Sequence, residues 1–149
     1  MSDLMNRAAV LTAVQQIEIR DCKMPSPQKG EVLLEMAYVG ICGSDAHFYE
    51  SGKRKGADIP LPFILGHEAS GTVIALGEGV TGLKLGDNVT LEPQQTCGVC
   101  EFCKGGHYNM CPSIAFPSVP PYDGMLQKYF CFPAHLCFKL PKEIGRAHV

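Results

Sequence analysis

The stretch Glu31-Val32-Leu33-Leu34-Glu35-Met36-Ala37-Tyr38-Val39-Gly40-Ile41 decides the fold class, because it is the clearest buried strand of the chain. Its branched and aromatic side chains suit a pleated surface. On either side, short apolar runs alternate with turns rich in the 16 glycines and 11 prolines. The pattern predicts further strands over residues 7–14, 15–20, 69–76, 88–91, 125–132 and 135–140. Short helical turns are expected over 44–51, capped by Ser44, and an exposed loop over 53–56. Many short strands favour a mainly β barrel or sandwich.

Length and composition restrict the class of protein. The 149 residues correspond to one domain, with 46% hydrophobic and 19% charged residues. The 13 basic against 15 acidic residues give a net charge of −2, which argues against nucleic acid or an anionic membrane as the partner. No apolar run approaches the roughly 18 residues of a membrane span, and no signal peptide pattern opens the chain. We therefore expect a cytoplasmic protein whose eight cysteines are thiols or metal ligands.

Four cysteines are spaced as C-x2-C-x2-C-x7-C at Cys97, Cys100, Cys103 and Cys111. Four thiolates complete the tetrahedral shell of Zn²⁺ and leave no position open, so the spacing predicts a structural zinc ion. Two other interpretations compete with it. The cysteines could be buried or redox-active thiols, or they could hold an iron–sulfur cluster.

A second group of possible ligands is spread along the chain at Cys42, His67 and Glu68, each beside glycine-rich strand ends. Cysteine, histidine and carboxylate together suit a catalytic zinc, which keeps one position for water or substrate. Taken singly, Cys42 reads as a core thiol and His67 as a core histidine. Adjacent residues of a regular strand point to opposite faces. Glu68 is therefore a direct ligand only if the backbone bends, and otherwise it orients the ligands from behind.

The run Gly77-Glu78-Gly79-Val80-Thr81-Gly82 matches the G-x-G-x-x-G pattern of dinucleotide sites. That function also requires a helix whose amide groups meet the pyrophosphate. The residues that follow read as a turn into a strand, so we expect no cofactor-binding residues in this chain. Phe48, Phe116 and Tyr122 are open to two interpretations, as the lining of a substrate cleft or as ordinary packing.

Several motifs together resemble the N-terminal, GroES-like half of zinc-containing medium-chain alcohol dehydrogenases. The matching stretches are 39–45, 65–71, 86–89 and the four-cysteine lobe. Residues 91–93, 108–112 and 120–124 resemble the polyol subgroup, meaning sorbitol, L-iditol or xylitol dehydrogenases. The resemblance covers residues 6–142 and implies a GroES-like β-barrel with few short helices and a zinc-binding lobe at 93–113. In this family a Rossmann domain carrying NAD follows, and that domain is absent from this chain.

The resemblance also implies roles for individual residues. Cys42 and His67 would bind a catalytic zinc, with Glu68 as a ligand or near-ligand. Ser44 would hydrogen-bond the substrate oxygen, and His47 would pass the proton to solvent. It implies two zinc ions per chain, NAD in the full-length enzyme, and a homo-oligomer acting on a small polyol or secondary alcohol. Alternatives are a 2,3-butanediol or L-threonine 3-dehydrogenase domain, or a zinc-binding barrel without catalysis.

Residues 143–149 have a sequence that one frame of a common sequencing adapter would encode. We therefore interpret this tail as an artefact outside the domain at 6–142. Because the resemblance places the hydride acceptor in a second domain, we expect this chain alone to be inactive.

Overall fold

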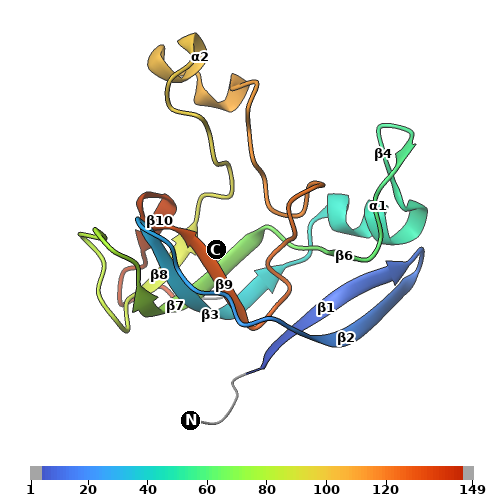
Figure 1. Ribbon diagram of the computed structural model, residues 1–149, viewed down its shortest axis with the longest axis horizontal. Coiled ribbons are helices and arrows are strands. Elements are labelled where there is room, and N and C mark those ends of the chain that lie inside the picture. The colour runs from blue at the N-terminus through green and yellow to red at the C-terminus, as the bar shows by residue number, and fades with distance from the viewer. Residues whose placement is uncertain (1–4, 146–149) are drawn as a thin grey trace.

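The computed structural model describes residues 5–145, and the main strands form two curved antiparallel sheets (Figure 1). The larger sheet has five strands in the order β10-β8-β7-β3-β9. Its strands are β3 (Glu31–Gly40), β7 (Glu68–Leu76), β8 (Asn88–Leu91), β9 (Tyr129–Pro133) and β10 (Cys137–Lys139). β3 lies between β7 and β9, as expected for the most apolar strand of the sequence.

The smaller sheet has the order β2-β1-β6, formed by β1 (Asn6–Ala13), β2 (Gln16–Cys22) and β6 (Phe63–Ile64). A short segment before β9 joins this sheet to the larger one. On one side the amide of Ala9 donates to Leu126 O at 2.8 Å, and on the other the amide of Met36 donates to Lys128 O at 2.9 Å. The two sheets therefore continue into each other as an incompletely closed barrel.

The apolar core has two main clusters, the first built mainly from inward-facing strand positions and the second from strand, helix and loop residues together. The first fills the five-stranded sheet with Val32, Leu34, Ala69, Val73, Val89, Leu91, Met125, Phe132 and Cys137. The second packs helix α1 (Gly43–Ser51) against the smaller sheet through Leu11, Phe48, Ile59, Phe63 and Leu65. Burial of each large apolar side chain contributes roughly 1.5–3 kcal/mol.

A buried asparagine ties the first strand to the barrel. Asn6 is 1% exposed, and its amide nitrogen donates to Gln127 Oε1 at 2.8 Å and to Tyr129 O at 3.1 Å. Its carbonyl oxygen accepts from the amide of Tyr129 at 2.8 Å. The polar side chain thus satisfies backbone groups of β9 that would otherwise be buried without partners.

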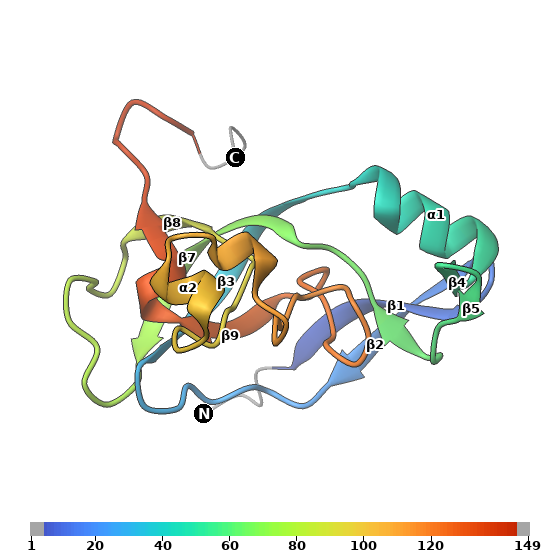
Figure 2. The same ribbon diagram turned by 90° about the horizontal axis from the view of Figure 1, so that it is seen from above.

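The four-cysteine lobe projects away from the sheets in Figure 1 and carries two short helices, α2 (Glu101–Lys104) and η1 (Tyr108–Met110). A further short helix, η2 (Ala134–Leu136), joins β9 to β10. Figure 2 shows α1 at the opposite end of the molecule from β8 and β10, beside the small hairpin of β4 (Lys53–Arg54) and β5 (Ala57–Asp58).

The mainly β architecture is confirmed, whereas several local predictions were wrong. Helix α1 begins after Cys42, not after Ser44, because the Asp45 carboxylate accepts the amide of Cys42 at 3.1 Å. The basic run 53–56 is exposed but lies within the β4–β5 hairpin. Strand β6 has two residues, too few for a period, and was not predicted.

The structure bears in part on two further expectations, the lack of a membrane span and the interpretation of residues 143–149. Within residues 5–145, no helix combines the length and the apolar character needed to cross a membrane. Of the predicted tail, residues 146–149 lie outside the described residues, and Ile144 donates its amide to Pro141 O at 3.1 Å.

Candidate metal centres

The four lobe cysteines converge as their spacing predicts. The sulfur atoms of Cys97, Cys100, Cys103 and Cys111 all lie within 4.8 Å of one another. Gly98 and Gly106, at φ +69° and +80°, provide the left-handed turns that fold this short segment back on itself. Four soft ligands at this separation match the donor set of a closed tetrahedral zinc shell.

Backbone amides of the lobe point at the sulfurs. Cys100 donates to Cys97 Sγ at 3.4 Å, Cys103 to Cys100 Sγ at 3.5 Å, and Cys97 to Cys111 Sγ at 3.5 Å. The amides of Val99 and Cys100 stabilise the thiolate and lower the pKa of Cys97 to about 6. The lobe therefore presents an anionic sulfur near neutral pH, which is the form that binds metal.

The second ligand group is brought together by the ends of two paired strands. Gly40 at the end of β3 lies opposite Glu68 at the start of β7. Cys42 lies two residues after the end of β3, and His67 directly precedes β7. The possible ligand atoms of Cys42, His67 and Glu68 all lie within 4.8 Å of one another. Residues 25 positions apart in the sequence thus meet at one corner of the barrel.

The question left open by the sequence, whether Glu68 can meet its neighbour His67, depends on Gly66. Gly66 has φ +94°, so the chain bends immediately before His67 and only Glu68 belongs to the regular strand. A Cβ on Gly66 would lie 2.8 Å from Val39 Cγ1 and 2.9 Å from Leu126 Cγ, so the bend also requires a residue without a side chain at this position. The backbone bends where a direct Glu68 ligand requires it.

A nearby segment holds this bend in place. Gly124 donates to Ile64 O at 2.7 Å, Met125 to Gly66 O at 2.8 Å, and Leu126 to Leu65 O at 2.9 Å. The approach is so close that a Cβ on Gly124 would collide with the carbonyl of Leu65. The loop carrying His67 is therefore fixed by backbone hydrogen bonds from residues about 60 positions away.

His67 has two contacts that sequence reasoning missed. Its ring packs edge-on against Phe116, with centroids 5.3 Å apart. Its Nδ1 atom is buried without a hydrogen-bond partner and lies 3.7 Å from Oδ1 of Asp45, which is 2% exposed. Asp45 belongs to the matching stretch 39–45, but no role was predicted for it.

These contacts test whether the residues suit a metal ion. A ligating histidine usually donates its other ring N–H to a carboxylate or carbonyl. The buried Nδ1 of His67 beside Asp45 matches this arrangement and leaves Nε2 available as the ligand. One thiolate, one imidazole and one carboxylate form a donor set that zinc accepts with a position still open. The site thus fits an accessible zinc ion.

The other predicted site residues lie on helix α1. Ser44 and His47 are both exposed and are three positions apart, so they share one face of the helix. His47 Nε2 lies 3.4 Å from Ser51 Oγ. Of the three aromatic residues open to two interpretations, Phe48 is core, Phe116 contacts His67, and Tyr122 is exposed.

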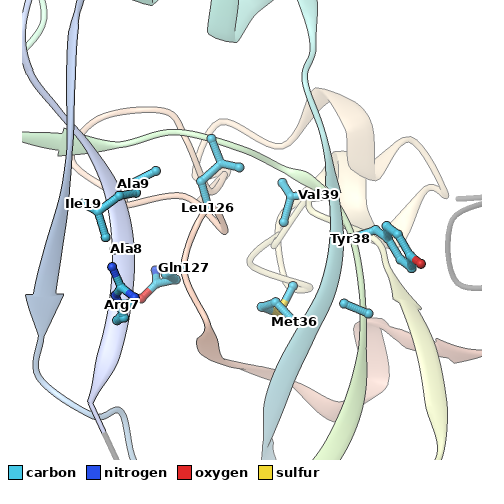
Figure 3. A pocket seen from close by; sticks show the side chains of 10 residues that line it. Arg7, Ala8, Ala9, Ile19, Met36, Tyr38, Val39, Leu126 and Gln127 are labelled. Carbon is cyan, nitrogen blue, oxygen red and sulfur yellow. The ribbon is translucent and has the colours of Figure 1, made fainter.

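Two cavities open on the barrel, and neither is lined by Cys42, His67 or Glu68 themselves. One of about 480 Å³ opens between β1 and β3 and is lined by Arg7, Met36, Tyr38, Val39 and Leu126 among others (Figure 3). Another of about 540 Å³ is lined by Ile41, Asp45, Ala46 and Tyr49, so it borders the residues on either side of Cys42. The second cavity is therefore the one adjacent to the candidate site.

The glycine-rich run at 77–82 forms a turn-rich loop after β7, and no helix intervenes in the described chain before β8. A Cβ on Gly77 would collide with the carbonyl of Gln28 and lie 2.8 Å from Glu31 O. Close backbone approach explains this glycine without a dinucleotide.

Comparison with known proteins identifies a family to which this chain is similar. Residues 28–142 match the family model described as the alcohol dehydrogenase GroES-like domain. A probable D-xylulose reductase A of Aspergillus clavatus is 43% identical over 141 residues, covering 94% of this chain and 39% of that protein. The chain thus spans about two fifths of the length of the curated relatives it matches.

Solved structures agree with this fold. An Escherichia coli oxidoreductase/dehydrogenase of unknown specificity superposes with a TM-score of 0.87 at 39% identity, over 97% of this chain and 42% of that one. A putative zinc-binding dehydrogenase of Sinorhizobium meliloti, bound to NADP, gives 0.81 at 28% identity, over 95% and 40%. The resemblance drawn from the motifs is confirmed, and the chain belongs to the alcohol dehydrogenase GroES-like domain family.

Proposed function

We propose that this chain is the catalytic domain of a zinc-dependent, NAD-linked polyol dehydrogenase, which oxidises a secondary alcohol of the sorbitol or xylitol type to a ketone. The observation that carries the proposal is the convergence of Cys42, His67 and Glu68 within 4.8 Å beside an exposed Ser44. The 43% identity to a probable D-xylulose reductase supports the polyol class.

In this proposal Cys42, His67 and Glu68 hold the catalytic zinc, and the four lobe cysteines hold a second, structural one. When bound, zinc supplies Lewis-acid polarisation that lowers the pKa of the substrate hydroxyl, and a nicotinamide cofactor supplies the hydride acceptor. Asp45, behind His67, keeps the imidazole ring oriented. Phe116 packs against the same ring and limits water access on that side.

Two side chains of helix α1 transfer the proton of the substrate to solvent. Ser44 lies in the first turn after Cys42, where its hydroxyl oxygen takes the proton of the substrate alcohol as its own hydrogen passes to His47. His47, one turn further along the same face, accepts that hydrogen as a proton and releases a proton to solvent, which its exposed position allows.

The remaining assignments are part of the same proposal. The domain comprises residues 6–142, with the zinc lobe at 93–113. Large apolar side chains at Ile19, Tyr38 and Ile41 are 52–67% exposed, which supports their burial in a whole enzyme, including its homo-oligomer. A thiol-based site requires reduced cysteines, which the cytoplasm maintains.

Metal content tests the catalytic site against a purely structural zinc barrel. Purified chain should carry two zinc ions, measured by elemental analysis. Cys42→Ala should lose one ion, and Cys100→Ala should lose the other. A wild-type chain with a single zinc that survives Cys42→Ala would overturn the proposal.

Substrate class is tested by joining residues 1–142 to the remaining C-terminal part of the Aspergillus clavatus relative. NAD reduction should be fastest with xylitol or sorbitol and slower with 2,3-butanediol and L-threonine. A preference for butanediol or threonine in a chimera that holds two zinc ions would refute the polyol assignment.

A further inference from the structure

Behind the Cys42 site lies a small network of buried hydrogen bonds that ends on a serine from the 112–122 segment. Ser118 is 1% exposed, and its hydroxyl donates to Asp45 Oδ1 at 2.9 Å. The same hydroxyl oxygen accepts the amide of Gly66 at 3.0 Å. Because the lone hydroxyl hydrogen is used on Asp45 and a lone pair on Gly66, Ser118 has one fixed orientation.

Asp45 is the junction of this network. Its Oδ2 accepts the amide of Cys42 at 3.1 Å, and its Oδ1 accepts the amide of Gly66 at 3.1 Å. Oδ1 also lies 3.7 Å from the buried Nδ1 of His67. The Asp45 carboxylate therefore contacts the backbone of Cys42 and faces the ring of His67. A rotation of this carboxylate would change the positions of both proposed ligands.

The backbone of Ser118 is in an unfavourable conformation for its residue type. Its φ is +67°, a region that glycine adopts without steric cost and that other residues rarely occupy. The feature that serine has and glycine lacks is the hydroxyl. Strained residues held in place by their surroundings are typical of functional sites.

We propose that Ser118 is a positioning residue of the Cys42 site, which fixes the Asp45 carboxylate against His67 and so sets the metal affinity. This inference rests on the proposed zinc site. Without the hydroxyl, Asp45 Oδ1 keeps only the Gly66 amide as a firm donor and can turn away from Nδ1. Loss of such a supporting partner typically weakens metal binding 10–100-fold.

The test is a chelator competition on the 149-residue chain loaded with Co²⁺, read by its absorption bands. Ser118→Ala should weaken the Cys42 site 10–100-fold, and the four-cysteine site should be unchanged. The lobe serves as an internal measure of folding, together with circular dichroism. Ser113→Ala, an exposed serine of the same segment, is the matched control and should leave both sites unchanged.

Ser118→Gly separates the hydroxyl from the backbone. Glycine relieves the positive φ but removes the hydroxyl, so it should weaken the Cys42 site as much as alanine does. Wild-type affinity in Ser118→Ala, or in Ser118→Gly alone, would overturn the inference. A uniform weakening of both metal sites would also overturn it, because it would mean a general structural role.

A wrong zinc-site proposal would give a different result from a wrong role for Ser118. If the wild-type chain binds metal only in the lobe, the zinc site itself is refuted. The ring signals of His67 in the metal-free chain, observed by NMR, then decide the positioning role. Ser118→Ala should shift them if Ser118 orients Asp45, and unchanged signals would overturn the inference.

Discussion

A Cβ atom on Gly40 would lie 2.9 Å from Oε2 of Glu68, its partner across the β3–β7 pair. The absent side chain of Gly40 therefore leaves the space that the Glu68 carboxylate occupies. Since Glu68 is one of the three proposed ligands, Gly40 in β3 leaves room for a ligand carried by β7.

Gly40→Ala should displace the Glu68 carboxylate and weaken metal binding at the Cys42 site by about tenfold, as for other disturbances around a ligand. Gly43→Ala is the matched control, because a Cβ there meets nothing within 4 Å and the φ is not positive. Chelator competition measures both variants. Equal affinity in Gly40→Ala and wild type would show that the Glu68 position does not matter for the metal.

Gly124→Ala should destabilise the whole barrel by roughly 3 kcal/mol, because the new Cβ collides with backbone and not with a flexible side chain. Gly66 O would also lie 2.6 Å from that Cβ, so the loop before His67 must shift. Urea denaturation measures the change. A loss below about 0.5 kcal/mol, the range of ordinary surface substitutions, contradicts the packing described here.

Asn6→Ala should cost roughly 2–3 kcal/mol, because it leaves the buried amide and carbonyl of Tyr129 without their side-chain partner. Asn109→Ala, an exposed asparagine in the lobe, should change the stability little. Denaturant unfolding of both variants, with zinc held in excess, makes the comparison. Similar stabilities for the two variants would disprove the role of Asn6 in closing the barrel.

Cysteine alkylation should depend on pH in a site-specific way in the metal-free chain. The lowered pKa of Cys97, about 6, means that its reactive thiolate predominates at pH 7 and is lost as the pH falls below 6. Burial raises the pKa of Cys131 to about 11 and that of Cys137 to about 12, so both remain protonated at pH 7. Mass spectrometry after brief iodoacetamide treatment should find Cys97 modified first, and zinc should protect it.

Ser44→Ala in the chimeric enzyme should lower kcat by roughly 10²–10⁴, the usual contribution of positioned proton transfer, with two zinc ions still bound. Ser113→Ala is again the control. Turnover equal to wild type at full zinc content would remove Ser44 from the mechanism.

The predictable parts of this structure are those encoded over short distances. The alternation and branching of 31–41 predicted β3, and the spacing of the lobe cysteines predicted their convergence, because all four lie within one short segment. Two-residue strands such as β6 (Phe63–Ile64) were missed because their pairing with β1 depends on the tertiary fold alone.

The network behind the Cys42 site was missed for the same physical reason. Asp45 and Ser118 are 73 residues apart, and neither belongs to a pattern that marks it as buried. In sequence, Ser118 is one of two serines in the proline-rich segment 112–122, and nothing distinguishes it from Ser113. Only the folded barrel shows that this hydroxyl reaches the carboxylate behind His67.

The contrast in ligand spacing has a consequence for biosynthesis. The lobe can capture its metal as soon as Cys111 leaves the ribosome, since its contacts are local. The Cys42 site contains the earliest ligand to be synthesised, yet its support from Ser118 and the 124–126 segment is translated only after Cys111 has completed the lobe. Long-range contacts of this kind form late in folding. If the chain holds the two metal ions proposed above, a nascent chain should fill the lobe before the Cys42 site, although Cys42 is translated first.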